Sequence, residues 1–432
     1  MNTSLRASRA GLASGALLAA VALTACGTAS SAAGGAAGSP TAATPTAASA
    51  SGTARSGGSS SAAASASGAA STAPVAATTA AGAPTGTATV PSGGPVPSGF
   101  AATSVTFVSP DEAFVLGTAP CAKAPCTSIL RTLDRGASWR GLPAPVAPLA
   151  AGAGSAPAGA AVWGIRFANP SDGFVFGNGL WETTDGGERW ASVASPGATI
   201  ESLAVIDGQV LAVAGTCSPN FGCAQTGTLM RRPLAGGAWT VVATVTGQGG
   251  IATLARVAAV VDGSRVVVTG DGGISAVTRA TPCHAEGINV PSSLAVTGPD
   301  GLALLCAGEG AAGSVGKTVY VSDDLGARWT EAGSPARGGD PEELSAASGS
   351  QLVTAAASGA SMLYYSADGG ARWTTAYYAG DGGLGFNDLG FTTATNGVVV
   401  YGPVASDSNA EGRPGRLLLT SNGGASWQAV SY

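Results

Sequence analysis

One short motif recurs six times along this chain and constrains its fold more than any other feature. A hydroxyl residue is followed by Asp two positions later, Gly after two more, and Trp after a further three. The copies are TLDRGASW ending at Trp139, TTDGGERW at Trp190, the degraded RPLAGGAW at Trp239, SDDLGARW at Trp329, SADGGARW at Trp373 and TSNGGASW at Trp427. We call this sequence the turn motif. Its recurrence predicts a repeat protein.

The spacing of the motif gives the number of repeats. Successive tryptophans lie 51, 49, 90, 44 and 54 residues apart, and 90 is two steps of 45. This predicts seven units over residues 98–432, one of which, near residue 284, has lost the motif. Short runs such as Asp271-Gly-Gly are interpreted as ordinary turns. Units of 40–50 residues with several short strands are typical of β-propellers.

Each residue of the motif suits a tight turn. Asp or Asn and the hydroxyl accept backbone N–H bonds, Gly adopts a positive φ, and Trp buries a large ring beside a neighbouring strand. We therefore expect structural rather than catalytic roles. The residues are Asp134, Gly136, Trp139, Asp185, Gly187, Trp190, Asp324, Gly326, Trp329, Asp368, Gly370, Trp373, Asn422, Gly424 and Trp427.

The motif resembles the Asp-box, or BNR, repeat of sialidase-like β-propellers. A second phrase, at residues 107–117, recurs at 167–177 and more loosely at 391–402. Together the two phrases are most similar to propellers related to the photosystem II assembly and stability factor. The resemblance implies an all-β, seven-bladed propeller of four-stranded antiparallel blades over residues 98–432, and a protein-binding style of function.

Connection lengths indicate which face carries function. The connections between second and third strands, and between units, are longer than the others. They span residues 118–126, 215–226, 307–316 and 403–414, and 143–160 and 331–341. In a four-stranded meander these connections emerge on one face, which we call the loop-rich face. We expect the binding site there; the alternative is that these Gly/Ala-rich insertions are passive.

The N-terminal residues resemble a bacterial lipoprotein signal. Arg6 and Arg9 precede an apolar stretch over residues 11–23, which is too short to span a membrane, where about 20 residues are needed. It ends in Leu23-Thr24-Ala25-Cys26, a lipobox. The resemblance implies removal of residues 1–25, a lipid on Cys26, and a cell-membrane location on the extracytoplasmic face. The alternative is an ordinary secretory signal with a chance cysteine.

Residues 26–97 are predicted to form a disordered tether. They are almost entirely Ala, Gly, Ser, Thr and Pro, with Arg55 as the single charge. Such a segment has too little apolar surface to offset the entropy lost on ordering. Its root-mean-square reach would be roughly 45–50 Å.

The six remaining cysteines agree with export. An even number outside a reducing compartment indicates disulfides, and proximity favours Cys121–Cys126, Cys217–Cys223 and Cys283–Cys306 among fifteen possible pairings. No Cys-x-x-Cys pair occurs, and His284 is the one histidine. We therefore expect no metal site and no cofactor.

The sequence argues against a sialidase. Such enzymes clamp the substrate carboxylate with three arginines, but only Arg166 and Arg256 are placed in first strands. A glycoside hydrolase needs just two carboxylates, and one pair could come from the loop-rich face. The candidates are Asp340, Glu342 and Glu343, or Asp381 and Asp388; acidic loop residues are more often solvated turns.

We expect a monomeric, surface-tethered, non-catalytic propeller that binds an envelope or extracellular protein or a glycan. A net charge of −5 offers no footprint for nucleic acid, and membrane contact would be through the Cys26 lipid alone. The alternative is a BNR-type glycoside hydrolase with a divergent site. A purely structural spacer is a third possibility.

Overall fold

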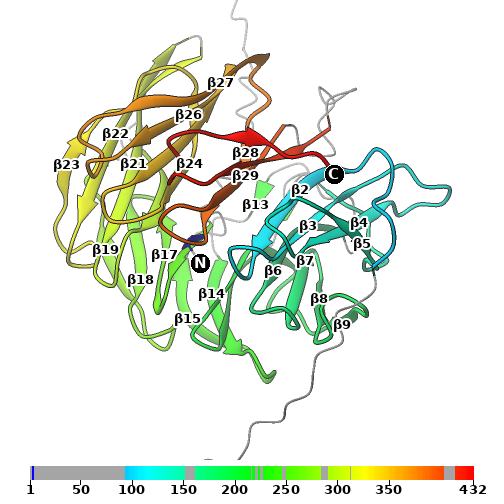
Figure 1. Ribbon diagram of the computed structural model, residues 1–432. Helices are drawn as coiled ribbons and strands as arrows, with labels where there is room; N and C mark the ends of the chain where they lie inside the picture. Colours follow the sequence, from blue (N-terminus) through cyan, green and yellow to red (C-terminus); the bar gives the residue numbers. More distant parts are fainter. Residues whose placement is uncertain are drawn as a thin grey trace, which may run out of the picture. The chain divides into compact units, whose positions relative to one another are not determined.

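The propeller contains seven blades of four antiparallel strands each (Figure 1). The computed structural model describes residues 93–150, 161–215, 227–245, 250–283, 290–311, 313–402 and 414–432, and the backbone alone of residues 2–3, 217–218 and 222–223. These residues contain no α-helix, and hence no helix able to cross a membrane. The predicted fold class is confirmed. Cys26, His284 and most of residues 26–97 lie outside the described residues.

Every blade is built from consecutive strands, so none is completed by a distant segment. Blade 1 contains β2 (Ala101–Phe107), β3 (Ala113–Thr118), β4 (Thr127–Thr132) and β5 (Arg140–Leu142), and blade 2 contains β6 (Val162–Phe167), β7 (Gly173–Gly177), β8 (Leu180–Thr183) and β9 (Ala191–Val193). Blade 3 contains β10 (Thr199–Ile206), β11 (Gln209–Gly215), β14 (Gly227–Pro233) and β15 (Thr240–Val245), and blade 4 contains β16 (Ile251–Leu254), β17 (Val257–Asp262), β18 (Arg265–Thr269) and β19 (Val277–Ala280).

Blades 5 to 7 follow the same order. Blade 5 contains β20 (Val290–Val296), β21 (Leu302–Ala311), β22 (Ser314–Ser322) and β23 (Thr330–Gly333), and blade 6 contains β24 (Asp340–Ala346), β25 (Leu352–Ala357), β26 (Gly359–Ser366) and β27 (Thr374–Gly382). Blade 7 contains β28 (Phe386–Phe391), β29 (Gly397–Tyr401), β30 (Arg416–Thr420) and β31 (Gln428–Ala429). Two short elements lie outside the blades. The strands β12 (Cys217–Ser218) and β13 (Gly222–Cys223), which lie between β11 and β14 in the sequence, form a separate two-stranded ribbon, and the backbone of β1 (Asn2–Thr3) pairs with β16 and β28.

The first strand of each blade contacts the first strand of the next, which closes the ring from β2 through β28 and back to β2. These strands carry buried apolar side chains on both faces, and each junction between blades has its own core. Ahead of blade 1, Gly94 pairs with Gly141 of β5. The chain therefore already contacts the propeller before residue 98, where we expected the domain to begin.

The turn motif forms the connection between the third and fourth strands. In blade 1, Thr132 Oγ1 accepts from the Gly136 N–H at 2.9 Å and donates to Asp134 Oδ1 at 2.8 Å. Asp134 Oδ1 also accepts from the Ser138 N–H at 2.8 Å. Gly136 has φ +84°, where a side chain is strained. The same three bonds recur in blades 2, 5, 6 and 7.

Blade 4 contains the turn motif, contrary to the expectation of a lost copy near residue 284. Thr269 Oγ1 donates to Asp271 Oδ1 at 2.7 Å and accepts from the Gly273 N–H at 2.9 Å. Asp271 also accepts from the Ser275 N–H. Ala276 stands where the other copies have Trp. The search for tryptophan missed this copy because the turn itself does not need the ring.

The tryptophans follow two patterns. In blades 2, 3 and 5 the indole Nε1–H donates at 3.1 Å to a carbonyl of the preceding blade. These bonds join Trp190 to Pro143, Trp239 to Ala194 and Trp329 to Ala280. In each case the acceptor lies four residues after the position that the tryptophan of the motif occupies in the preceding blade, which is position 139, 190 or 276. In blades 1, 6 and 7 the indole donates instead to the glycine of its own turn.

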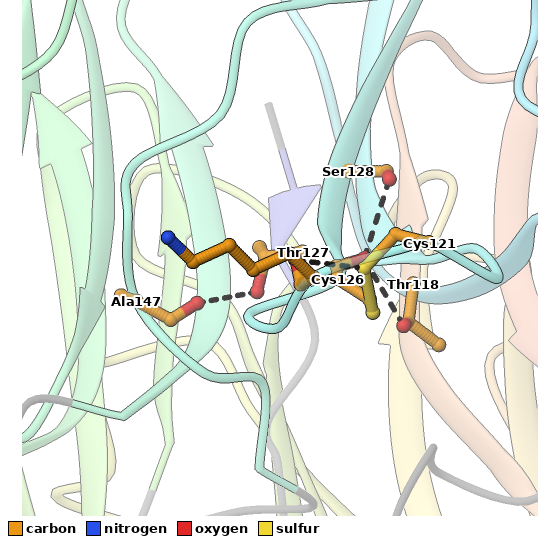
Figure 2. Close-up of a disulfide and its surroundings, with 7 residues drawn as sticks. Thr118, Cys121, Cys126, Thr127, Ser128 and Ala147 are labelled. Carbon is orange, nitrogen blue, oxygen red and sulfur yellow. Dashed lines mark hydrogen bonds between the residues drawn. A yellow bond between two sulfur atoms is a disulfide. The ribbon is translucent and has the colours of Figure 1, made fainter.

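Two of the three proposed disulfides are present. Cys121–Cys126 closes the connection between β3 and β4, and Cys283–Cys306 joins the end of blade 4 to β21 of blade 5. Figure 2 shows the first. The carbonyl oxygen of Cys126 accepts from the hydroxyls of Thr118 and Ser128, which fixes this end of the loop to the blade. Cys217 and Cys223 are backbone partners in the ribbon, but their side chains lie outside the described residues.

Candidate functional site

A chain of polar contacts joins the first strands around the central axis. Ser104 Oγ accepts from the Ile165 N–H, Ser202 Oγ from the Ile251 N–H and Ser293 Oγ from the Leu344 N–H, each time from one blade to the next. These side chains follow a register shift in their own strands. Such β-bulges redirect side chains. We call this set of contacts the inner ring.

The inner ring becomes charged in blades 6 and 7. The Glu343 carboxylate accepts from the backbone N–H groups of Asp388 and Leu389, at 3.0 and 2.6 Å. Asp388 Oδ2 in turn accepts from the Ser104 hydroxyl at 2.5 Å and from the Val105 N–H at 3.0 Å. Blade 6 is thereby joined to blade 7, and blade 7 to blade 1.

Arg166 of blade 2 extends the charged contacts across blade 1. Its Nη2 donates to Asp388 Oδ1 at 2.8 Å, and the two side chains are 9% and 4% exposed. Breaking such a pair leaves a buried charge without compensation. Arg166 therefore lies in a first strand, as predicted, but holds three blades together instead of meeting solvent.

Burial and the nearby charge of Asp388 together raise the pKa of Glu343 to about 8, although the hydrogen bond from the Leu389 N–H opposes the shift. A neutral acid beside an ionised one is the arrangement of many general acid–base pairs. Here, however, both side chains are buried and bonded to backbone N–H groups. The expectation that Glu343 and Asp388 are solvated loop acids is wrong, because both lie in first strands.

Arg256 and the arginines of the turn motif lie on the opposite face. Arg256 is in the turn between β16 and β17, not in a first strand as predicted, and pairs with Asp207 at 2.8 Å. Arg189 and Arg328 pair at 2.9 Å with the aspartates of their own turns. These arginines do not converge with Arg166, so the described residues form no three-arginine clamp.

The junction between blades 7 and 1, which we call the seam, closes the ring without a shared strand. The Ala102 N–H donates to the Gly415 carbonyl at 2.8 Å. Tyr432 packs edge-on against Phe100 and Trp139, with ring centroids 5.2 and 5.6 Å apart. Phe100 and Trp139 belong to one core with Val398, Val400 and Leu417 of blade 7.

A cavity of about 380 Å³ opens at the seam on the loop-rich face. We call it the seam pocket. Asp381 at the end of β27, Tyr401 of β29 and Arg416 of β30 supply its polar groups, and Phe100 and Tyr432 contribute aromatic walls. A second cavity of about 520 Å³ lies at the same seam on the opposite face, between the turn motifs of blades 1 and 7.

Asp381 fixes the polar side of the seam pocket. Its Oδ2 accepts from the Tyr401 hydroxyl at 2.6 Å, and its carboxylate accepts from the Ser361 hydroxyl and the Gly383 N–H. Burial alone would raise the pKa of Asp381, but these hydrogen bonds lower it below its usual value. Burial and the Asp381 charge raise the pKa of Tyr401. The tyrosine therefore stays protonated and donating, which does not suit it to act as a nucleophile.

Lys317 is the other notable charge on the loop-rich face. The carbonyls of Val315, Ala336, Arg337 and Gly338 lie 2.9–3.1 Å from the buried ammonium and share its three N–H donors. Burial lowers the pKa of this amine to about 8. Lys317 holds the connection between blades 5 and 6 in place and is enclosed by protein. Among the described residues, no three His, Cys, Asp or Glu side chains gather as a possible metal site.

Known proteins resemble this chain in fold. No family model matches it. No curated protein matches its sequence. The solved structure of YCF48 from Cyanidioschyzon merolae has a TM-score of 0.50 at 15% identity, covering 76% of this chain and 97% of that one. The likeness is one of fold. YCF48 bound to D1 peptide gives a TM-score of 0.49 at 16% identity, covering 75% and 93%. The GH74 enzyme of Niastella koreensis gives 0.27 at 13%, covering 76% and 71%.

Proposed function

We propose that this chain is a lipid-anchored, non-catalytic propeller that binds a protein or glycan with its loop-rich face on the extracytoplasmic side. The observation that carries the proposal is that the ionisable side chains of the inner ring hold neighbouring blades together. Arg166, Glu343 and Asp388 join blades and are buried, so they are not available to a substrate. The seam pocket, in contrast, is open on the loop-rich face.

The anchor and the compartment rest on the sequence and the disulfides. The Leu23-Thr24-Ala25-Cys26 lipobox supports lipidation, and the two disulfides support an oxidising compartment. Mass spectrometry of the mature N-terminus should find diacylglycerol on Cys26, and Cys26→Ala should release the protein into the medium. An unmodified Cys26 in a membrane-retained protein would contradict this part of the proposal.

Crosslinking from the two faces tests the binding function. A photoreactive residue replaces Lys123, which is exposed in the connection between β3 and β4 on the loop-rich face, or Arg189, which is 90% exposed on the opposite face. In intact cells we expect a discrete crosslinked partner or glycan from position 123 and none from position 189. Equal labelling from both positions, or none from 123, would contradict a loop-rich binding face.

Glycoside hydrolysis is the second candidate function, because the raised pKa of Glu343 beside Asp388 is the kind of pair such enzymes use. Purified protein is tested on sialyl and neutral glycans. Hydrolysis that is lost in Asp388→Asn or Asp381→Asn, while the variant stays folded, would favour this function over binding. We expect no turnover.

A further inference from the structure

The guanidinium of Arg416 lines the seam pocket beside the aromatic ring of Tyr401. The Arg416 guanidinium carbon lies 5.1 Å from the centroid of the Tyr401 ring, within the range of a cation–π contact. This contact orients the planar guanidinium, while the Arg416 side chain itself remains exposed at the pocket. The ring that supports it is held in turn by the hydrogen bond from Tyr401 to Asp381.

Arg416 differs from the exposed arginines of the turn motif. Arg189, Arg328 and Arg372 each pair with an aspartate of their own turn. Within the part of the chain that the structure describes, Arg416 forms no such ion pair, although Asp381 lines the same cavity. The Asp381 oxygens already accept from three donors, the hydroxyls of Ser361 and Tyr401 and the Gly383 N–H. The pocket therefore offers an oriented cation but not an unoccupied anion.

Apart from Ser431, the remaining side chains of the walls are mainly apolar. Phe100 is 6% exposed and Tyr401 3% exposed, and Leu384 and Val430 are half-buried beside them. A cavity of about 380 Å³ falls near the lower end of the range for small-molecule sites, roughly 300–1,000 Å³. Its size and lining suit one apolar group rather than a long polymer segment.

We propose that the seam pocket binds a carboxylate joined to an apolar or aromatic group, with the guanidinium of Arg416 on the carboxylate and the rings of Phe100, Tyr401 and Tyr432 around the apolar part. A guanidinium matches both oxygens of a carboxylate at once, which a neutral amide does not reproduce. A peptide C-terminus and a free aromatic acid share this chemistry. Asp381 acts as a positioning residue that fixes Tyr401. The proposal deepens the binding function proposed above and rests on it.

Titration with a matched pair of small probes tests the site. The full chain carrying Cys26→Ala is titrated with N-acetylphenylalanine and with N-acetylphenylalaninamide, which differ only in the carboxylate. We expect the acid to bind with a Kd at or below about 1 mM and at least tenfold more tightly than the amide. Arg416→Gln should reduce this preference to less than about threefold. The matched control Arg372→Gln, on the opposite face, should preserve it.

Other variants and probes sharpen the result. Tyr401→Phe keeps the ring but loses the bond to Asp381, so the preference for acid should fall less than in Arg416→Gln. A tripeptide acid ending in Phe that binds more tightly than N-acetylphenylalanine points to a peptide C-terminus, and equal binding points to a free acid. Equal affinity for acid and amide, absence of acid binding at millimolar concentration, or the same loss in Arg372→Gln would overturn the proposal. If the acid binds but position 123 captures no partner in cells, the site stands and the partner-binding function fails.

Discussion

Blades 3 and 4 have lost opposite halves of the same motif. Blade 3 keeps Trp239 but has Arg232 and Leu234 at the hydroxyl and aspartate positions. Blade 4 keeps Thr269 and Asp271 but has Ala276 instead of Trp. Trp239 still donates to the Ala194 carbonyl of blade 2, and the blade 4 turn still forms all of its hydrogen bonds. The two halves therefore act separately: the acid closes a turn, and in blades 2, 3 and 5 the indole joins two blades.

Blade 3 also shows how the missing half is replaced. The Arg232 side chain, buried at the hydroxyl position, pairs with Glu182 of blade 2 at 2.9 Å and lies over the rings of Phe174 and Trp239. This arrangement strengthens contact with the preceding blade but does not rebuild the turn. The difference teaches that the motif aspartates belong to the scaffold, which agrees with the binding site proposed on the loop-rich face.

The largest effect is expected from removing the indole in blade 3. Trp239→Ala should lower the free energy of unfolding by about 2–3 kcal/mol, somewhat less than for a fully buried ring, because Trp239 is half-buried. Trp239→Phe is the control; it keeps a ring and loses the N–H bond, at about 1 kcal/mol. Urea unfolding measures both. A loss below about 0.5 kcal/mol for Trp239→Ala would mean that the indole does not join the blades.

Removing the acid in blade 4 should have an intermediate effect. Asp271→Ala loses the bonds to Thr269, Ile274 and Ser275 and should cost about 1–2 kcal/mol, as for comparable capping residues. Asp271→Asn should cost less, since Asn422 occupies the equivalent position in blade 7 and accepts from the Ser426 N–H. Equal losses in the two variants would show that the turn depends on charge alone.

Acid should reveal the same contribution as a pH dependence. Burial would raise the pKa of Asp271, but bonds from Ser275, Thr269 and Ile274 lower it well below its usual 3.8. The unfolded state therefore takes up this proton first, so stability present above pH 3.8 is lost as pH falls below it. As the pH falls from 5 to below 3.8, the free energy of unfolding of the wild type should decrease more than that of Asp271→Asn. Parallel curves would refute a folded-state pKa shift.

The smallest effect should come from restoring the missing indole. By the four-residue rule of the other blades, Trp at position 276 would face the carbonyl of Ala243, which packs with Ala276 in the core between blades 3 and 4. Ala276→Trp should raise stability by about 0.5–1 kcal/mol. Ala276→Leu, which adds apolar surface without a donor, is the control. A destabilisation above about 1 kcal/mol would mean that this junction has repacked around the alanine.

The fold was predictable because the turn motif is local. Residues within eight positions set each turn, so their spacing gave seven blades, and Thr269, Asp271 and Gly273 carried enough signal to find the fourth copy. The inner ring was not predictable in the same way. Asp388 meets Ser104 and Arg166 across sequence separations of 284 and 222 residues, at positions set by closure of the ring.

The seam pocket shows the same limit. Asp381 lies in β27 of blade 6, whereas Tyr401 and Arg416 are paired residues of β29 and β30 in blade 7, so the three meet only after blade 6 packs against blade 7. Sequence singled out Asp381 for another reason, as a possible hydrolase acid. Arg416 had no local pattern to mark it. Its placement opposite the walls supplied by Phe100 and Tyr432 depends on the seam.

A double-mutant cycle in blade 2, whose motif is complete, tests the separation of the two jobs most directly. Asp185 bonds within its turn to Thr183 and Arg189, whereas Trp190 donates to Pro143 of blade 1. Urea unfolding is measured for Asp185→Ala, Trp190→Ala and the double variant. If the two roles are independent, the losses in the free energy of unfolding should add within about 0.5 kcal/mol. A coupling above about 1 kcal/mol would contradict the account, because it would show that the turn and the bond from Trp190 to blade 1 form one unit.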